Sequence, residues 1–199
     1  MDYELTMNAI NDLAAKANQL YLDLNKKIEQ NHTTFIDPIL ADQRDTQTTA
    51  AQIAELYRQA QQTLDSAVKQ KQDDINKRYH GDVTADQLAN INQLAKYDLS
   101  EDELAGYLDK YKDNLPLLKA FELVIKDKGW LIDGLTYDNE IEFLKRFKSL
   151  MQAVVDGMQN GSPKGLPLET KIASNMLTGH VKDWKAKVKS SAYTLRHMY

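Results

Sequence analysis

The chain has 199 residues, of which 42% are hydrophobic and 27% are charged, with eight glycines, four prolines and no cysteine. This apolar content argues against a wholly disordered chain, and the length suits one domain or two small ones. The absence of cysteine excludes disulfides, thiolate metal sites and cysteine nucleophiles. No apolar run is long enough to span a bilayer, and the first residues lack the basic and apolar regions of a signal peptide. We therefore expect a cytoplasmic protein without a transmembrane segment.

Residues from about 3 to about 30 have the spacing of a long amphipathic helix. Steps of three and four residues connect Ile10, Leu13, Ala17, Leu20 and Leu24. This spacing places them on one narrow stripe, which has to be buried against another helix. The polar run 31–34 then interrupts the pattern.

A second helix is expected to begin at Asp37 and Pro38, with Asp37 as N-cap and Pro38 in the first turn. Phe35 and Ile36 are in position to pack on that turn as a hydrophobic staple. The helix continues with the apolar series Ile53, Tyr57, Ala60, Leu64 and Ala67. We favour one continuous helix on the order of 60 Å long, ending near residue 80, over a short helix at 38–42 followed by a second start at residue 49. The short connection makes the two helices an antiparallel hairpin.

The remainder of the chain predicts shorter helices. Signals for their first turns are Thr84, Ser100, Pro116 and Asp138, with Asp138 as the expected N-cap of a strongly amphipathic helix. A short helix at about 168–177 and a last helix from about 181 to the end follow, and no segment shows the alternation of a strand. The predicted fold class is all-α. A coiled-coil-like antiparallel hairpin, residues 1–80, precedes a compact helical domain, residues 82–199.

No segment has the spacing of a catalytic, metal or cofactor motif. Glu29 and His32 form a single Glu-x-x-His pair, whereas a di-iron helical bundle needs two such pairs and two further glutamates. Glycine motifs for phosphate binding are absent as well. We therefore predict no catalytic residue, no metal and no cofactor. A minor alternative is an enzyme whose site combines separated residues such as Trp130, Tyr137, Asp138 and Glu140.

Charge is distributed unevenly, although the formal net charge is only −4. Residues 81–114 contain eight acidic side chains and three lysines, whereas residues 161–199 contain seven basic and two acidic side chains. In the predicted last helix, the basic stripe consists of Lys182, Lys185, Lys189 and Arg196. Such a stripe can contact nucleic acid, an anionic membrane or an acidic protein. The simpler interpretation is a helix that docks on the domain by its apolar face and leaves these side chains in solvent.

The apolar face of the hairpin is wider than two helices can bury, which predicts a third and a fourth helix. These two helices come either from the hairpin of a second copy or from other helices of the same chain. The candidate partner interface consists of Ile10, Leu13, Leu20, Leu24, Ile53, Leu56, Tyr57, Leu64 and Val68.

The leading hypothesis is a non-enzymatic helical interaction or assembly protein. It associates with itself or with a helical partner through the hairpin. The alternative is a nucleic-acid-associated accessory protein that uses the basic C-terminal helix, residues 181–199. The composition, rich in Asp, Asn, Gln and Lys, also resembles that of small helical proteins of bacteria and phages. A bacterial or phage origin is a guess that rests on this composition alone.

Overall fold

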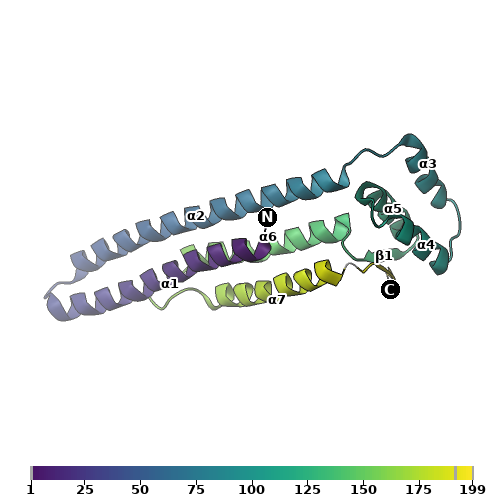
Figure 1. The fold of residues 1–199 in the computed structure, drawn as a ribbon. Helices are drawn as coiled ribbons and strands as arrows, with labels where there is room; N and C mark the ends of the chain where they lie inside the picture. The colour runs from purple at the N-terminus through teal and green to yellow at the C-terminus, as the bar shows by residue number, and fades with distance from the viewer. Residues whose placement is uncertain (1, 191, 199) are drawn as a thin grey trace. The chain divides into compact units, whose positions relative to one another are not determined.

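The computed structural model describes residues 2–190 and 192–198 and places most of them in helices (Figure 1). The described helices are α1 (Tyr3–Thr34), α2 (Ile39–Tyr79), α3 (Ala85–Leu94), α4 (Glu101–Tyr111), α5 (Leu115–Asp127), α6 (Tyr137–Gln159) and α7 (Leu168–Ser190). Two short strands, β1 (Trp130–Asp133) and β2 (Thr194–His197), accompany them. The fold is all-α, as predicted. Among the described residues, no helix combines the length and the apolar character that crossing a bilayer requires.

The N-terminal hairpin is confirmed, and α2 is one continuous helix of 41 residues. The Asp37 carboxylate accepts a hydrogen bond from the Ile39 N–H (3.2 Å) at the beginning of α2. The staple, in contrast, is wrong, because Ile36 is fully exposed and Phe35 is 49% exposed. These two side chains do not pack on the first turn.

Several helix starts follow the sequence signals. Thr84 and Ser100 each form a complete capping box with the residue three positions later. Asp138 is not an N-cap, because it lies inside the first turn of α6. The N-cap of α6 is instead the buried Thr136, whose hydroxyl accepts a hydrogen bond from the Asn139 N–H (3.3 Å).

The C-terminal region differs most from the prediction. α7 is a single helix that continues past Gly179 and ends at Ser190, so neither the short helix 168–177 nor the helix 181–199 is correct. Thr194–His197 pairs antiparallel with Trp130–Asp133. Four-residue strands are too short to show alternation, and their pairing across the sequence stabilises them instead. In one cross-strand pair, the rings of Trp130 and His197 lie 3.7 Å apart.

The described elements form two compact units. Unit 1 comprises residues 1–69 and 146–181, and unit 2 comprises residues 70–145 and 182–199. Helices α2, α6 and α7 each contribute to both. These units do not coincide with the predicted domains 1–80 and 82–199, because the C-terminal part of α6 and the first part of α7 pack with the hairpin.

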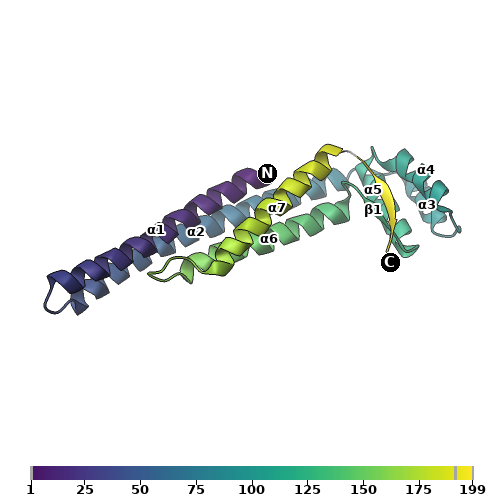
Figure 2. The same ribbon diagram turned by 90° about the horizontal axis from the view of Figure 1, so that it is seen from below.

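Unit 1 is built from four helices (Figures 1 and 2). The buried stripe of α1 is Tyr3, Met7, Ile10, Ala14, Ala17, Tyr21 and Leu24, at steps of four and three. The Tyr21 hydroxyl donates to the Met158 carbonyl of α6 (3.0 Å), and the Ser174 hydroxyl of α7 lies 3.1 Å from Asn11 Oδ1 of α1. The pairing within the chain therefore supplies the third and fourth helices.

Unit 2 has its own core, formed by the inward faces of α3, α4 and α5 together with β1. Glu140 of α6 is almost completely buried. Its carboxylate pairs with both terminal nitrogens of the Arg78 guanidinium and accepts a hydrogen bond from the Tyr79 hydroxyl (3.1 Å). The Tyr79 hydroxyl also lies 2.8 Å from the Leu135 carbonyl. This buried network joins the end of α2 to the beginning of α6.

Candidate functional site

The predicted partner interface is packed within unit 1. Four of its side chains, Ile10, Leu24, Ile53 and Leu64, are buried, and the other five, Leu13, Leu20, Leu56, Tyr57 and Val68, are half-buried. In α1 the buried stripe is rotated toward Ala14 and Tyr21, away from Leu13 and Leu20. A periodic apolar pattern identifies the buried face of a helix only to within one residue position. Packing against α6 and α7 determines which of the neighbouring residues are buried. A surface for a partner therefore has to be sought elsewhere on the hairpin.

The far end of the hairpin lacks the two covering helices. Among the described residues, the hydrogen bonds that connect α1 to the C-terminal segments closest to this end are those of Tyr21 with the Met158 carbonyl and of Asn18 with the Leu166 N–H (2.9 Å). On α2, Gln61 contacts Gln152 of α6 (2.8 Å). Residues 25–52 lie beyond these contacts and form a two-helix projection, here called the arm (Figure 1).

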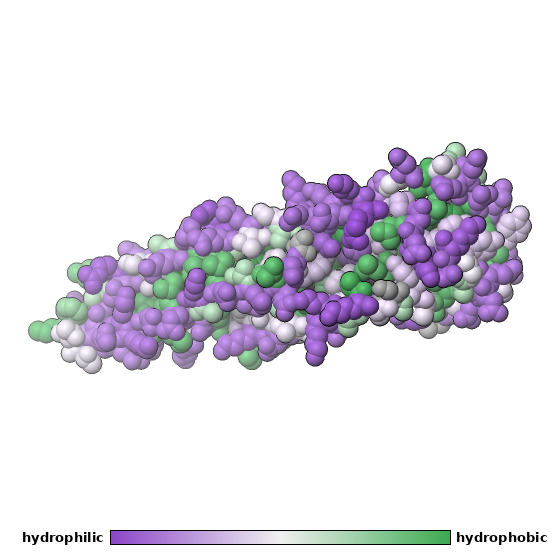
Figure 3. Space-filling model, viewed as in Figure 1, coloured by the Kyte–Doolittle hydropathy of each residue, from purple (hydrophilic) through white to green (hydrophobic). Residues whose placement is uncertain are grey.

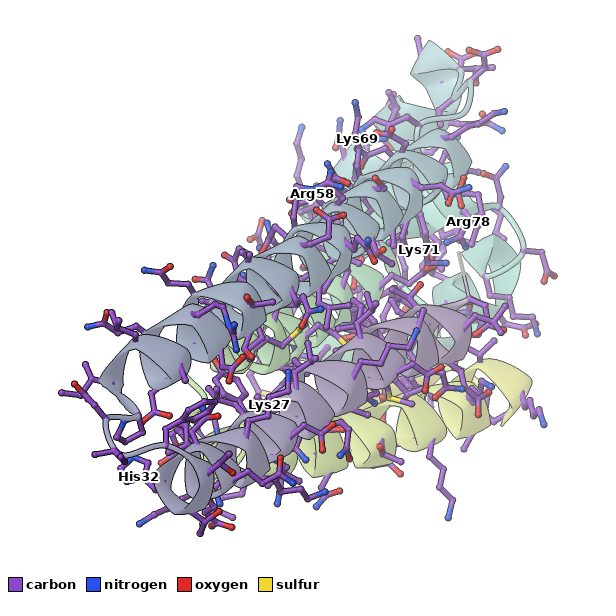
Figure 4. The ribbon with its side chains drawn as sticks, turned by 90° about the vertical axis from the view of Figure 1, so that its left-hand side faces the viewer. Lys27, His32, Arg58, Lys69, Lys71 and Arg78 are labelled. Atoms are coloured by element: carbon purple, nitrogen blue, oxygen red, sulfur yellow. The ribbon has the colours of Figure 1, made fainter. Side chains whose placement is uncertain are left out.

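The interior of the arm is held by polar contacts near its end. The Asn31 side-chain amide donates to Asp42 (2.9 Å) and to Asp45 (3.1 Å), and Asn31 is buried. His32 Nε2 lies 2.9 Å from Asp42 Oδ2. The hydrogen bond from Asn31, together with His32, lowers the pKa of Asp42 below its ordinary value. Figure 4 looks at this end of the molecule, with His32 beside the turn.

The tip of the arm exposes four large apolar side chains within six positions. These are Phe35 (49% exposed), Ile36 (108%), Ile39 (60%) and Leu40 (78%). Hydrophobic atoms are visible at the arm's end in Figure 3. Single exposed apolar residues are ordinary, but four of them within six positions make the tip a candidate interaction surface.

The outer surface of α2 next to the tip has few charges. Residues 46–54 are Thr, Gln, Ala and one Ile, with no charged side chain, in a chain of which 27% is charged. Apart from Thr49 and Ile53, these residues are exposed. The depletion of charge is typical of the central part of protein–protein interfaces. This lack of charge is visible in the sequence itself, because it depends on no tertiary contact.

The predicted basic stripe is divided between two elements. Lys182, Lys185 and Lys189 lie on α7, whereas Arg196 lies on β2. Their neighbour Lys187 pairs with Asp133 of β1 (2.6 Å). This contact lowers the pKa of Asp133 below its ordinary value. The stripe therefore does not occupy one continuous helix.

Trp130 and Asp138, two of the four residues in the minor enzyme alternative, line the same cavity of about 440 Å³ in unit 2. Glu140 belongs to the separate buried network with Arg78. In the cavity Asp138 pairs with Lys126 (3.1 Å), and burial raises the pKa of Glu122 above its ordinary value. Among the described residues, no group of three or more His, Asp or Glu side chains is placed to hold a metal ion.

Comparisons with protein-family models, with curated proteins and with solved structures found no match for the chain. The function of the chain therefore has to be inferred from the surfaces described above. Of these, the arm has the most distinctive combination of features, because an incomplete helical bundle ends in an exposed apolar group.

Proposed function

We propose that the chain is a non-enzymatic helical assembly protein whose arm, residues 25–52, pairs with the arm of a second copy. The observation that carries this proposal is the change along unit 1 from four packed helices to two. Isolated two-helix segments bury little apolar surface, and a wider bundle is the usual way in which such helices are stabilised.

A second arm in antiparallel orientation continues the four-helix packing of the body. The tip of one arm then reaches the base of the other, where Leu22 is a further exposed apolar side chain. A two-fold axis between identical arms is also the commonest symmetry of soluble oligomers.

The charge of the arm favours a protein surface over an anionic membrane. Residues 25–52 contain four acidic side chains and three lysine or arginine side chains. Amphipathic segments that bind anionic lipid are rich in Lys and Arg beside their apolar residues. The arm lacks such a basic excess, so its apolar tip fits the uncharged surface of another helix pair better.

The experiment is sedimentation analysis of the wild-type chain and of the double variant I36D/L40D over a wide concentration range. Both side chains are exposed, so the variant keeps its fold. Burying one apolar side chain contributes about 1.5–3 kcal/mol, and two-fold symmetry doubles each effect. One buried position alone therefore changes the dimer dissociation constant by about 10²–10⁴-fold.

The matched control is L123D/L168D, which introduces the same charge at two other exposed leucines. It is expected to associate like the wild type. If the wild type sediments as a monomer of 22.7 kDa at all concentrations, or if I36D/L40D associates as strongly as the control, the proposal is wrong.

Nucleic-acid binding through the basic C-terminal residues stays a prediction. Its test is binding of a labelled single-stranded oligonucleotide at moderate salt by the wild type and by K182E/K185E/K189E. Retention of binding in the triple variant, or no binding by the wild type even at low salt, would remove this alternative.

A further inference from the structure

The two-stranded sheet of unit 2 leaves one strand edge without a neighbour. In an antiparallel pair, residues alternate between those that face the partner strand and those that face away. The Met198 N–H donates to the Gly129 carbonyl (3.0 Å), and the register opposes Ile132 to Leu195. Met198 and Gly129 are therefore a hydrogen-bonded pair, and the alternation makes Ile132 and Leu195 a non-hydrogen-bonded pair. The main-chain N–H and C=O of Leu195 consequently point away from β1.

The outer edge of β1 is closed, in contrast to that of β2. The Asn139 side-chain amide donates to the Ile132 carbonyl (3.0 Å) and to the Gly134 carbonyl (2.9 Å). These two carbonyls are therefore unavailable to a further strand. Within residues 2–190 and 192–198, no hydrogen bond reaches the outward N–H and C=O of Leu195. The open position on the edge of β2 is therefore the outward main chain of Leu195.

A groove of about 610 Å³ lies between β2 and α4. One wall is the segment from Ala192 to Leu195, which includes the open edge. Figure 2 shows β2 crossing unit 2 with α4 to its side. The volume is within the roughly 300–1,000 Å³ of pockets that bind compact ligands. The segment Ala192–Leu195 along this wall spans about 13 Å at 3.3 Å per residue, so the groove can accommodate an extended segment of similar length.

The other wall of the groove is acidic. α4 contributes Glu101, Asp102 and Asp109, with Lys112 as the basic side chain of this wall. Lys112 already forms an ion pair with Asp109. Burial raises the pKa of the Tyr193 hydroxyl, and the negative charges of Glu140 and of Asp113, just beyond α4, raise it further. Ala105, Leu108 and Leu195 supply the apolar part of the lining.

We propose that this groove binds an extended, lysine- or arginine-rich segment of a partner protein as a third strand on β2. Main-chain hydrogen bonds to the open edge provide affinity that does not depend on sequence, as in other cases of strand addition. The carboxylates of α4 select a basic segment over an acidic one and accelerate its association. The groove and the arm belong to different units, so this proposal does not depend on self-association.

The test uses a fluorescein-labelled octapeptide of alternating Lys and Val, with binding measured by fluorescence anisotropy on the full chain. Two further peptides separate charge from strand pairing. One alternates Glu and Val, and the other is the Lys-Val peptide with all backbone amides N-methylated, so that neither edge can donate. The Lys-Val peptide is expected to bind at least tenfold more tightly than either.

Two protein variants test the two walls. D102N/D109N removes charge from α4, and its control, D65N/D73N, removes the same charge from exposed positions of α2. L195P removes the outward N–H, which proline tolerates at an edge because that group does not pair with β1. We expect D102N/D109N and L195P each to weaken binding at least tenfold, and D65N/D73N to leave it unchanged.

Equal binding of the methylated and unmethylated peptides would overturn strand addition and indicate charge attraction alone. Equal binding by D102N/D109N and the wild type would overturn the assignment to this groove. If circular dichroism shows that L195P does not fold, the methylated peptide still decides the question, because it requires no change in the protein.

Discussion

The packing of α6 on α7 makes Gly157 a sensitive test of unit 1. A Cβ atom at this position would lie 1.9 Å from Thr170 Oγ1 and 2.9 Å from Thr170 Cβ. Rotation of the threonine side chain moves Oγ1 but leaves its Cβ in place, and Thr170 is buried. The substitution G157A therefore forces the two helices apart.

Gly179 provides a control in the same unit. It lies within α7, and an added Cβ would meet no atom within 4 Å. Replacing glycine by alanine in a helix interior stabilises by about 1 kcal/mol, because the unfolded chain loses conformational freedom. Both substitutions share this gain, but only G157A adds the cost of overpacking, about 1–3 kcal/mol. We therefore expect the free energy of unfolding of G179A to exceed that of G157A by the cost of overpacking, about 1–3 kcal/mol.

The assay is chemical denaturation followed by far-ultraviolet circular dichroism, which reports helices in both units. The two tryptophans, Trp130 and Trp184, belong to unit 2, so their fluorescence reports that unit separately. G157A is expected to lower the free energy of unfolding relative to G179A. Equal stabilisation by the two substitutions would show that α6 and α7 do not approach as closely as the structure indicates.

Three further predictions concern buried and charged groups. R78M should destabilise unit 2 by about 3–5 kcal/mol, because it leaves the buried Glu140 carboxylate without its bidentate partner; tryptophan fluorescence in denaturant measures this, and a loss below 1 kcal/mol would contradict it. Y79F should cost about 1–3 kcal/mol, because it removes the single hydroxyl proton that the Leu135 carbonyl and Glu140 share, and unchanged unfolding would refute the network. Since the pKa of Asp42 is lowered in the folded chain, its contribution is present above the unfolded pKa and is lost as the pH falls through the folded pKa. The stability difference between wild type and D42N should therefore shrink as the pH falls below the unfolded pKa of aspartate, about 3.9, and a constant difference in that range would contradict the assignment.

The long helices could be predicted because their signals are local. Steps of three and four residues, a capping residue and a following polar turn lie within a few positions of one another, and the continuous α2 and both capping boxes follow from them. The choice between Leu13 and Ala14 for the buried face could not be made locally. It depends on α6, which lies more than a hundred residues further along the chain.

The missed features share that dependence on distant partners. β2 is stabilised by pairing with β1 and by the ring contact of Trp130 with His197, and neither is visible in four residues of sequence. The hydrophobic staple predicted at the beginning of α2 is also wrong. Ile36 directly precedes the N-cap Asp37 and so has the position of a staple residue, but its side chain lies in solvent.

Pairing of the arms can be measured directly by the distance between spin labels on two copies. The chain has no cysteine, so Q47C carries a single label on the uncharged surface of α2. The arm part of α2, residues 39–52, is about 21 Å long at 1.5 Å per residue, so labels on two antiparallel arms lie within roughly 35 Å of each other. We predict an intermolecular dipolar signal in this range that disappears in I36D/L40D and on dilution with unlabelled protein. Absence of that signal at concentrations where the chain is associated would contradict pairing through the arm.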